Sequence, residues 1–336
     1  MSAPTAVSER IEASANGGGE PLRPRKKRML IIVNPYATTV SDRLKNLVVY
    51  ALQGRYEVEA VSTEAQNHAT EIGREAIDGG YDLVVAFGGD GTLNEIANGL
   101  AGTDVPVSIL PGGSTNVVAR TLGIPNDVVD ATEHLLGLAD RFEPRRIDLG
   151  IANGRRFVFS CGSGLDASAA MRVDQKPKLK ARAGPYFYTW VAVSAFYREY
   201  LRNPVRMRLE TGGETAEGVT VLAQNSDPFT YFASRPVRVC EGIEIDDGTL
   251  SIAVLRRAAQ RDMAPIIARV LSEGLRASRH RQIDHFDDVT EARVTSVSTD
   301  DAGAARPFPI QVDGDYIGAQ AELELAIDSG ALTIVA

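Results

Sequence analysis

A glycine-rich turn directly after an apolar run is the first place in this sequence where chemistry can be expected. Gly88-Gly89-Asp90-Gly91-Thr92 follows Leu83–Phe87, and apolar residues then recur at 93, 96, 97 and 100, the spacing of one helix face. Glycine lets a backbone approach a ligand closely. A helix N-terminus offers free N–H groups and a positive dipole end. The pattern indicates a phosphate-binding strand–turn–helix unit.

Asp90 lies inside this turn and would repel a phosphate unless a divalent cation stood between the two. Mg²⁺ is suited to that place, because it is held by a few carboxylates, waters and phosphate oxygens. The alternative is a tight turn in which Asp90 only caps the helix. A short motif leaves both interpretations open.

A second turn of the same kind, Pro111-Gly112-Gly113-Ser114-Thr115-Asn116, follows a strand that ends at Leu110. Its Ser, Thr and Asn supply polar groups at a helix start, although ordinary capping would use them too. Asn34-Pro35 ends an earlier strand at the same expected sheet edge. Two phosphate-compatible turns on successive strand ends favour one shared nucleotide site.

These turns require a sheet that brings strand ends together, and the alternation from Met29 onward predicts one. The expected strands are Met29–Val33, Tyr56–Val61, Leu83–Phe87 and Val105–Leu110, and the expected helices are Ser41–Leu52, Asn67–Ile77, Thr92–Leu100, Thr115–Leu122 and Val128–Leu138. Alternating strands and helices predict a parallel sheet covered on both faces. Ligands of such sheets bind at the carboxyl ends of the strands.

Beyond about residue 144 the sequence changes to short strands separated by Gly or Asp turns, with two helices near Pro185–Leu201 and Ala264–Ala277. The predicted fold class is α/β plus β: an N-terminal parallel-sheet nucleotide domain and a C-terminal antiparallel β-sandwich domain. The predicted boundaries are 1–28 for a disordered basic tail, 29–143 for the first domain and 144–328 for the second. Residues 329–336 are expected to return as a strand to the first domain.

Composition limits the function classes. The chain has 336 residues, a formal net charge of −8 and two cysteines. The acidic balance argues against nucleic acid as a partner, and two cysteines do not make a disulfide framework or zinc site. The first twenty residues lack the apolar core of a signal peptide, and no apolar run reaches the ~18–20 residues of a spanning helix. We therefore expect a cytoplasmic protein that is peripheral at the membrane.

Two segments have both a membrane and a structural interpretation. Five of the six residues at 23–28 are basic, and such a run binds acidic headgroups at about 1 kcal/mol per charge; it is equally typical of a solvated flank. The aromatic stretch from Tyr186 to Tyr200 would suit an acyl-chain cleft or the bilayer, whereas a helix packed on the β domain is the plainer interpretation.

Taken together, the motifs resemble the diacylglycerol kinase catalytic family, which includes bacterial lipid kinases and sphingosine kinases. The resemblance begins at about Arg28 and covers nearly the whole remaining chain. It rests on an ordered set of motifs: 88–95, 111–116, Ile147-Asp148-Leu149-Gly150, Asp246-Asp247-Gly248 and Val312-Asp313-Gly314-Asp315. The ordered set is far more specific than any single member.

The resemblance implies a nucleotide domain, a lipid domain and a cleft between them, with ATP and Mg²⁺ as cofactors. It implies that ATP is contacted by Asn34, Pro35, Tyr36, Ala37, Thr38, Thr63, Gly89, Asp90, Gly91, Thr92, Leu93, Asn94, Glu95 and Ser114. It also implies a structural Mg²⁺ near Asp247, with Glu244 and Thr249 as further ligands. The proton acceptor it implies is Asp315, and Asp90 and Asp148 are the other acidic residues suited to phosphoryl transfer.

The sequence departs from the family pattern at three places. Tyr36-Ala37-Thr38-Thr39 stands where the family often has Ser-Gly after Asn-Pro, and Val117 stands where it often has Asp. The final acid of the Asp-Gly-acid turn is Asp315, whereas Glu is common. These departures bear on the geometry of the substrate more than on the family.

The predicted function is ATP-dependent phosphorylation of a lipid hydroxyl, with diacylglycerol converted to phosphatidic acid as the first candidate. The chain has neither a P-loop sequence nor the His-Arg-Asp and Asp-Phe-Gly motifs of protein kinases. Two alternatives stay open: a small-molecule kinase of the NAD kinase type, and a non-catalytic lipid or nucleotide sensor. The expected partners are a lipid substrate in a membrane and an anionic membrane surface for the basic tail. A homodimer stays open as well.

Overall fold

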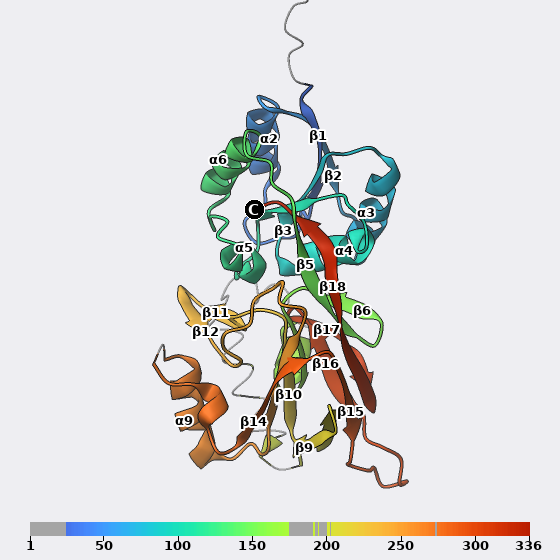
Figure 1. Cartoon of the computed structure of the whole chain (residues 1–336), viewed down its shortest axis with the longest axis vertical. Coiled ribbons are helices and arrows are strands. Elements are labelled where there is room, and N and C mark those ends of the chain that lie inside the picture. Colours follow the sequence, from blue (N-terminus) through green and yellow to red (C-terminus); the bar gives the residue numbers. More distant parts are fainter. Residues whose placement is uncertain (1–24, 175–190, 192–193, 195–199, 202, 273) are drawn as a thin grey trace, which may run out of the picture.

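The computed structural model describes residues 25–336 except 175–190, 192–193, 195–199, 202 and 273 (Figure 1). Most of the predicted tail, residues 1–24, lies outside the described residues. So does most of the predicted aromatic helix Pro185–Leu201, together with the basic positions that precede it. The predicted fold class is confirmed: an α/β layer is joined to a β-sandwich.

A parallel sheet forms the N-terminal part, as the alternation of strands and helices predicts. Its strands are β1 (Lys27–Val33), β2 (Tyr56–Ser62), β3 (Leu83–Gly88) and β4 (Val107–Pro111). β1 pairs with β2 and β3, and β3 pairs with β4, all in parallel. Every residue of β3 is buried, because helices cover both faces of the sheet.

Five helices accompany this sheet: α2 (Asp42–Leu52), α3 (His68–Asp78), α4 (Asp90–Leu100), α5 (Val117–Thr121) and α6 (Val128–Leu138). The helix predicted at Ser41–Leu52 is present as α2. Ser41 is its N-cap, and the Ser41 hydroxyl accepts the Leu44 N–H at 3.2 Å. α4 begins at Asp90, two residues before the predicted start. The Gly-Gly-Asp-Gly turn is therefore already helical at its third residue.

The C-terminal part is a sandwich of two sheets. β7 (Ser160–Gly164), β10 (Thr220–Gln224), β13 (Leu250–Leu255), β14 (Ile283–Val289), β16 (Phe308–Val312) and β17 (Asp315–Gln320) form one antiparallel sheet in the order β14-β13-β10-β7-β16-β17. β5 (Arg145–Ala152), β6 (Arg155–Phe157), β8 (Met207–Thr211), β9 (Glu214–Gly218), β15 (Glu291–Ser296) and β18 (Glu322–Ile334) extend the N-terminal sheet. Phe157, Met207 and Phe308 are fully buried in the apolar core between them.

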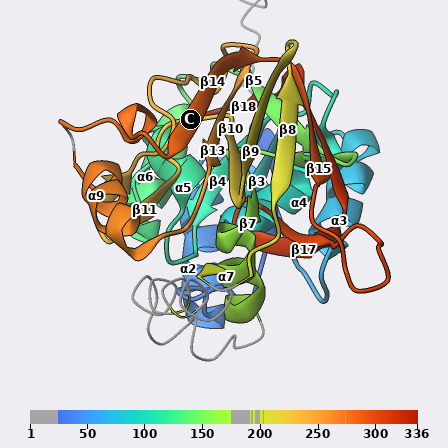
Figure 2. The ribbon, with the colours of Figure 1, turned by 90° about the horizontal axis from the view of Figure 1, so that it is seen from below.

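Smaller elements complete the C-terminal part. They are α7 (Leu165–Asp174), the hairpin β11 (Thr230–Phe232) and β12 (Arg235–Val237), α9 (Gln260–Val270) and a short 3₁₀ turn at Ala277–Arg279. α9 starts four residues before the helix predicted at Ala264–Ala277 and ends at Val270. Figure 2 shows α9 at the side of the sandwich, next to β14.

The last strand differs from the sequence prediction. Residues 329–336 were expected as a strand separate from the second domain, but β18 runs from Glu322 to Ile334 and pairs with β15, β5 and β4. The last part of β18, Leu332–Ile334, follows Leu323–Ala326 in the same strand. The Asp-Ser-Gly composition between them is typical of a turn. Here it makes a bulge in which Gly330 adopts φ +60 and donates its N–H to Asp148. One strand therefore ties the sandwich to the parallel sheet, where Ile334 pairs with Val107.

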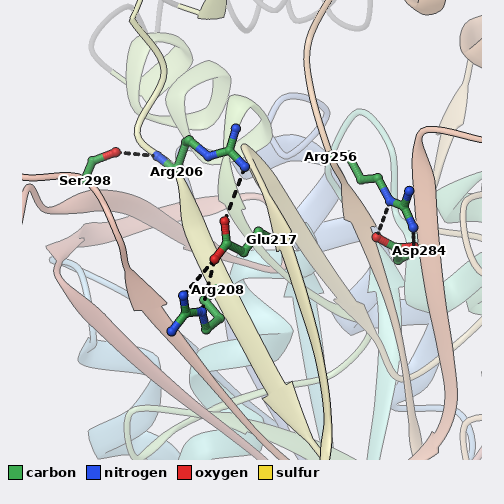
Figure 3. A network of polar contacts seen from close by, with 6 residues as sticks. All are labelled: Arg206, Arg208, Glu217, Arg256, Asp284 and Ser298. Atoms are coloured by element: carbon green, nitrogen blue, oxygen red, sulfur yellow. Dashed lines mark hydrogen bonds and ion pairs between the residues drawn. The ribbon is translucent and has the colours of Figure 1, made fainter.

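The exposed edge of the larger sheet carries a charged cluster (Figure 3). Glu217 of the edge strand β9 accepts hydrogen bonds from Arg208 at 2.8 Å and from Arg206 at 3.4 Å. The Arg208 guanidinium holds the pKa of the Glu217 carboxyl below its usual range. Solvent-exposed pairs of this kind add little stability, but charges on an edge strand oppose pairing with another chain. Among the described residues, no helix is long and apolar enough to cross a membrane.

Candidate active site

One large cavity, of about 1300 Å³, opens between the carboxyl ends of the parallel strands and the smaller sheet of the sandwich. Its walls differ in character. One end is lined by the polar turns after β1, β3 and β4, together with Asp315 and Arg155. The other end is lined by apolar side chains of the sandwich and α9, among them Leu222, Phe229, Val239, Ile266 and Val270.

The three polar turns are bonded to one another, so they form one rigid rim. Asn34 donates its amide N–H to the Thr92 hydroxyl at 3.1 Å. Gly112 donates its backbone N–H to the Gly88 carbonyl at 2.7 Å, and Thr39 donates its own to the Gly112 carbonyl at 3.1 Å. The shared sheet edge that the sequence predicts is therefore present, and the turns after β1, β3 and β4 meet there.

Asp315 lies directly against the Gly-Gly-Asp-Gly turn, although 224 positions separate it from Gly91 in the sequence. A Cβ atom on Gly91 would overlap the Asp315 carboxylate. A side chain at position 91 would therefore displace the Asp315 carboxylate from this place. Asp313 and Gly314 adopt φ +49 and +87, which turns the chain sharply and sets Asp315 at the cavity wall.

Asp90 makes contacts that neither sequence interpretation included. Its carboxylate accepts the backbone N–H groups of Val117 at 3.0 Å and Val118 at 3.2 Å, so it caps α5, the helix of the next unit, rather than its own. Burial raises the pKa of Asp90, and these backbone hydrogen bonds partly oppose that rise. Asp90 lines the cavity and fixes the second glycine turn relative to the first.

The cavity brings together most of the residues predicted to contact a nucleotide. Those that line it are Asn34, Tyr36, Ala37, Thr38, Thr63, Gly89, Asp90, Gly91, Thr92, Glu95 and Ser114. Pro35 lines a separate small hollow, and Leu93 and Asn94 are buried with only 1% exposed. Helical periodicity turns positions 93 and 94 of α4 away from the cavity. The predicted run 89–95 is therefore divided between cavity and core.

Asp313 is the residue whose role sequence reasoning missed. Its buried carboxylate accepts four hydrogen bonds: from the Asn94 side chain at 2.8 Å and from the N–H groups of Val158, Phe159 and Ser160 at 2.7, 2.9 and 3.1 Å. It thereby joins α4 to the segment between β6 and β7, two residues before Asp315. Its place in the Asp-Gly-Asp turn was the signal available in the sequence.

Asp313 also predicts a pH dependence of stability. Burial raises its pKa from 3.8 to about 6, and the four donated hydrogen bonds counter only part of that rise. A raised folded-state pKa means that the folded state holds the proton more tightly than the unfolded state. Relative to an Asp313→Asn variant, the wild type should therefore gain roughly 2–3 kcal/mol of unfolding free energy as pH falls from about 6 to 4. Urea unfolding of both proteins from pH 4 to 7.5 measures this difference. Parallel pH curves would contradict it.

Arg155 is a second functional candidate that the sequence did not single out. It lines the cavity and donates from Nη2 to the Asn94 side-chain oxygen at 3.1 Å. Its Nε atom is buried and has no hydrogen-bond partner among the described residues. Asn153-Gly154 makes the β5–β6 turn that directly precedes Arg155. This turn was the only nearby feature of the sequence that could have drawn attention to Arg155. Arg155 brings a guanidinium to the polar end of the cavity, and its positive charge is suited to an anionic ligand.

The rim of the cavity is also bridged between the two parts of the chain. Arg120 of α5 donates to the carbonyls of Ala233 and Ser234 at 3.0 and 3.3 Å, and it lies 3.5 Å from the ring centroid of Tyr231. Figure 1 shows the β11–β12 hairpin directly below α5. The contact holds Tyr231, which lines the cavity, against the N-terminal part.

Asp148 and the predicted metal ligands lie elsewhere. Asp148 is 3% exposed and accepts the N–H groups of Gly248 and Gly330, each at 2.6 Å, so it joins the 246–248 turn to the β18 bulge. Asp247 accepts the Glu244 N–H and both the N–H and hydroxyl of Thr249, each at 3.0 Å. Neither Asp148 nor Asp247 lines the cavity. These motifs therefore form a structural joint rather than a part of the cavity wall.

This joint offers oxygen ligands but few charges. In the described part of the chain, no three His, Cys, Asp or Glu side chains gather closely enough to hold a metal ion. Asp247 and the Thr249 hydroxyl are hard oxygen donors of the kind Mg²⁺ takes, and backbone carbonyls such as that of Glu244 could complete a partly hydrated site. The donor chemistry fits Mg²⁺, with one carboxylate as its only charged ligand.

The fold and the cavity define a two-domain protein with its site at the carboxyl ends of a parallel sheet. The family described as "Diacylglycerol kinase catalytic domain" matches residues 28–150, and "YegS C-terminal NAD kinase beta sandwich-like domain" matches residues 160–336. The chain belongs to the diacylglycerol kinase catalytic family, a family of lipid kinases.

Relatives agree with this assignment over most of their length. The diacylglycerol kinase of Bacillus subtilis (strain 168) is 29% identical over 300 residues, 87% of this chain and 91% of the relative. That of Staphylococcus aureus (strain MRSA252) is 26% identical over 302 residues, 87% of both chains. A crystal structure of a diacylglycerol kinase from Bacillus anthracis str. Sterne superposes with a TM-score of 0.66 at 19% identity, covering 92% of this chain and 96% of that one. The structural likeness concerns the fold.

Proposed function

We propose that this protein transfers the γ-phosphoryl group of ATP to the hydroxyl of a membrane lipid, with diacylglycerol as the first substrate. The observation that supports the proposal is the lining of the cavity: glycine turns and Asp315 at one end, and an apolar wall at the other. A nucleotide needs only the polar end. A lipid substrate explains why both ends belong to one cavity.

In the proposed reaction, each polar feature of the cavity has a role. The lipid hydroxyl oxygen forms a bond to the γ-phosphorus, the bond from that phosphorus to the β-bridging oxygen breaks, and ADP leaves. The hydroxyl proton passes to the Asp315 carboxylate. The N-terminus of α4 and the glycine turns suit the phosphates, and Arg155 offers a positive charge at the same end of the cavity. Mg²⁺ would neutralise phosphate charge during transfer.

The proposed function is tested by phosphorylation with labelled ATP over a panel of lipids in mixed micelles. The panel contains diacylglycerol, monoacylglycerol, ceramide and a sphingoid base, with NAD as a soluble control. We expect turnover that depends on a lipid and is highest with diacylglycerol. Phosphorylation of NAD alone would replace the proposal with a small-molecule kinase, and ATP binding without turnover on any lipid would indicate a sensor.

We also propose that Mg²⁺ binds at Asp247 as a structural ion. Asp247→Ala removes the acceptor of three hydrogen bonds in an exposed loop, so the melting temperature should fall by the equivalent of roughly 1 kcal/mol. Mg²⁺ should raise the melting temperature of the wild type, because it binds the folded state, and should leave that of the variant unchanged.

Thermal melts of both proteins with Mg²⁺ and with a chelator measure this difference. Asp246→Ala is the matched control, because Asp246 lies on the same loop as Asp247. The Asp246 carboxylate pairs with Arg145 of β5 at 3.0 Å and makes none of the Asp247 contacts. An equal response of wild type and Asp247→Ala to Mg²⁺ would place the ion elsewhere.

A further inference from the structure

The C-terminal end of α9 and the loop after it expose a group of apolar side chains, here called the apolar stripe. Ile267 lies on the last turn of α9, Leu271 is its C-cap and Leu275 lies in the loop that follows; they are 48%, 38% and 50% exposed. Ala264 and Ala268 of α9 are exposed as well. Three of the nine large apolar side chains that the described part of the chain leaves exposed are therefore close together in the sequence.

The same side chains are continuous with the interior of the cavity. Ile267 and Leu271 line it while remaining exposed, and the next residues inward, Ile266 and Val270, belong to its apolar wall. α9 therefore separates the apolar end of the cavity from solvent by the thickness of a single helix. An acyl chain passing along this helix would stay in contact with apolar groups.

Positive charge surrounds the stripe on a chain that is acidic as a whole. Residues 256–281 contain seven arginines and two acids, a net charge of +5, whereas the whole chain has −8. Arg261 and Arg281 have side chains 70% and 69% exposed, and Arg279 is exposed as well. Five of the seven arginines already pair with acids. Asp262 pairs with Arg257, Arg261 and Arg281, and two acids outside this segment, Asp284 and Glu241, pair with Arg256 and Arg276.

An exposed apolar stripe within an arginine cluster is complementary to an anionic phospholipid bilayer, which offers acyl chains beneath phosphate headgroups. We infer that α9 is the face by which this protein docks on an anionic membrane and takes its lipid into the cavity. This inference rests on the proposed function for the lipid, but the docking itself is a property of the surface.

Docking is tested with the full-length protein and vesicles of phosphatidylcholine with or without 30% phosphatidylglycerol, by co-sedimentation. The variants are Leu275→Asp and the double variant Arg261→Gln/Arg279→Gln, none of which lines the cavity. Each should weaken binding to the anionic vesicles by about tenfold or more. Leu47→Asp is the matched control: Leu47 is 56% exposed on α2 and should bind like the wild type.

A second arm compares the basic tail, because Arg23→Gln/Arg25→Gln removes two charges from the other basic run of the chain. Unchanged vesicle binding by both α9 variants, with loss in the tail variant, would overturn the inference. Activity separates it from the proposed function: the α9 variants should phosphorylate diacylglycerol in detergent micelles like the wild type and fail only on vesicles. If the protein docks through α9 but phosphorylates no lipid, the proposed lipid kinase function is wrong and the inference that α9 is the membrane-docking face still holds.

Discussion

Asp315→Asn should lower kcat by about 10²–10⁴-fold while ATP affinity and melting temperature stay close to those of the wild type. The amide keeps the size and polarity of the side chain but cannot accept the hydroxyl proton, a contribution of this order in general base catalysis. Asp315 stands at the cavity wall against Gly91, which places it where the phosphates are expected. Single-turnover kinetics with saturating lipid, together with nucleotide titration, measure the two quantities separately.

Two further variants complete this test. Asp315→Glu keeps a carboxylate and should retain far more activity than the amide. Asp148→Asn should instead lower stability, because Asp148 accepts two backbone N–H groups outside the cavity. A near-normal kcat for Asp315→Asn would show that a group other than Asp315 accepts the hydroxyl proton.

Gly89→Asp should abolish turnover in a protein that still folds. Gly89 has φ −92 and ψ −174, which any residue adopts, and a Cβ there would make an ordinary contact of 3.4 Å with the Gly113 Cα. The new carboxylate would instead meet the incoming phosphates. Two like charges ~4 Å apart at an effective dielectric of ~20 repel by about 4 kcal/mol, or roughly three orders of magnitude in affinity.

Gly89→Ala is the control, because it adds the methyl group without the charge and should keep most of the nucleotide affinity. Gly113→Ala is a useful contrast: its Cβ would lie 2.8 Å from the Gly89 Cα, so the two turns would have to separate. Nucleotide binding by Gly89→Asp at the wild-type level would show that the phosphates lie elsewhere.

The division of the chain into a parallel-sheet part and a β-sandwich could be predicted because both depend on local patterns. Hydrophobic runs separated by helical periodicity identify β1, β3 and β4. A glycine turn follows β3 and another follows β4, and Asn34-Pro35 follows β1, all at one sheet edge. Boundaries were less accurate where capping decided them. α4 starts at Asp90, two residues before the predicted start, because the Gly89 carbonyl accepts the backbone N–H groups of Thr92 and Leu93 and so begins the helix.

The grouping of the motifs was not predictable from order and spacing. Asp148 and Asp247 stand in the same ordered set as Gly91 and Asp315, yet the first two lie at a joint outside the cavity and the last two line the cavity. Long-range strand pairing decides which motifs lie next to one another in space. The residue types within a motif do not indicate which other motif it will contact.

The sequence by itself determined that strand ends with glycine turns would meet at one edge and that acidic turns would follow in the C-terminal part. Only the tertiary structure decided that Asp315 reaches the Gly91 turn, that Asp313 braces this contact with four hydrogen bonds, and that the apolar end of the cavity runs out onto α9. Turns and helix faces are set by neighbours within a few residues. Contacts across more than two hundred residues are set by how two sheets pack, because burial of apolar area rewards a whole arrangement and not any one pair.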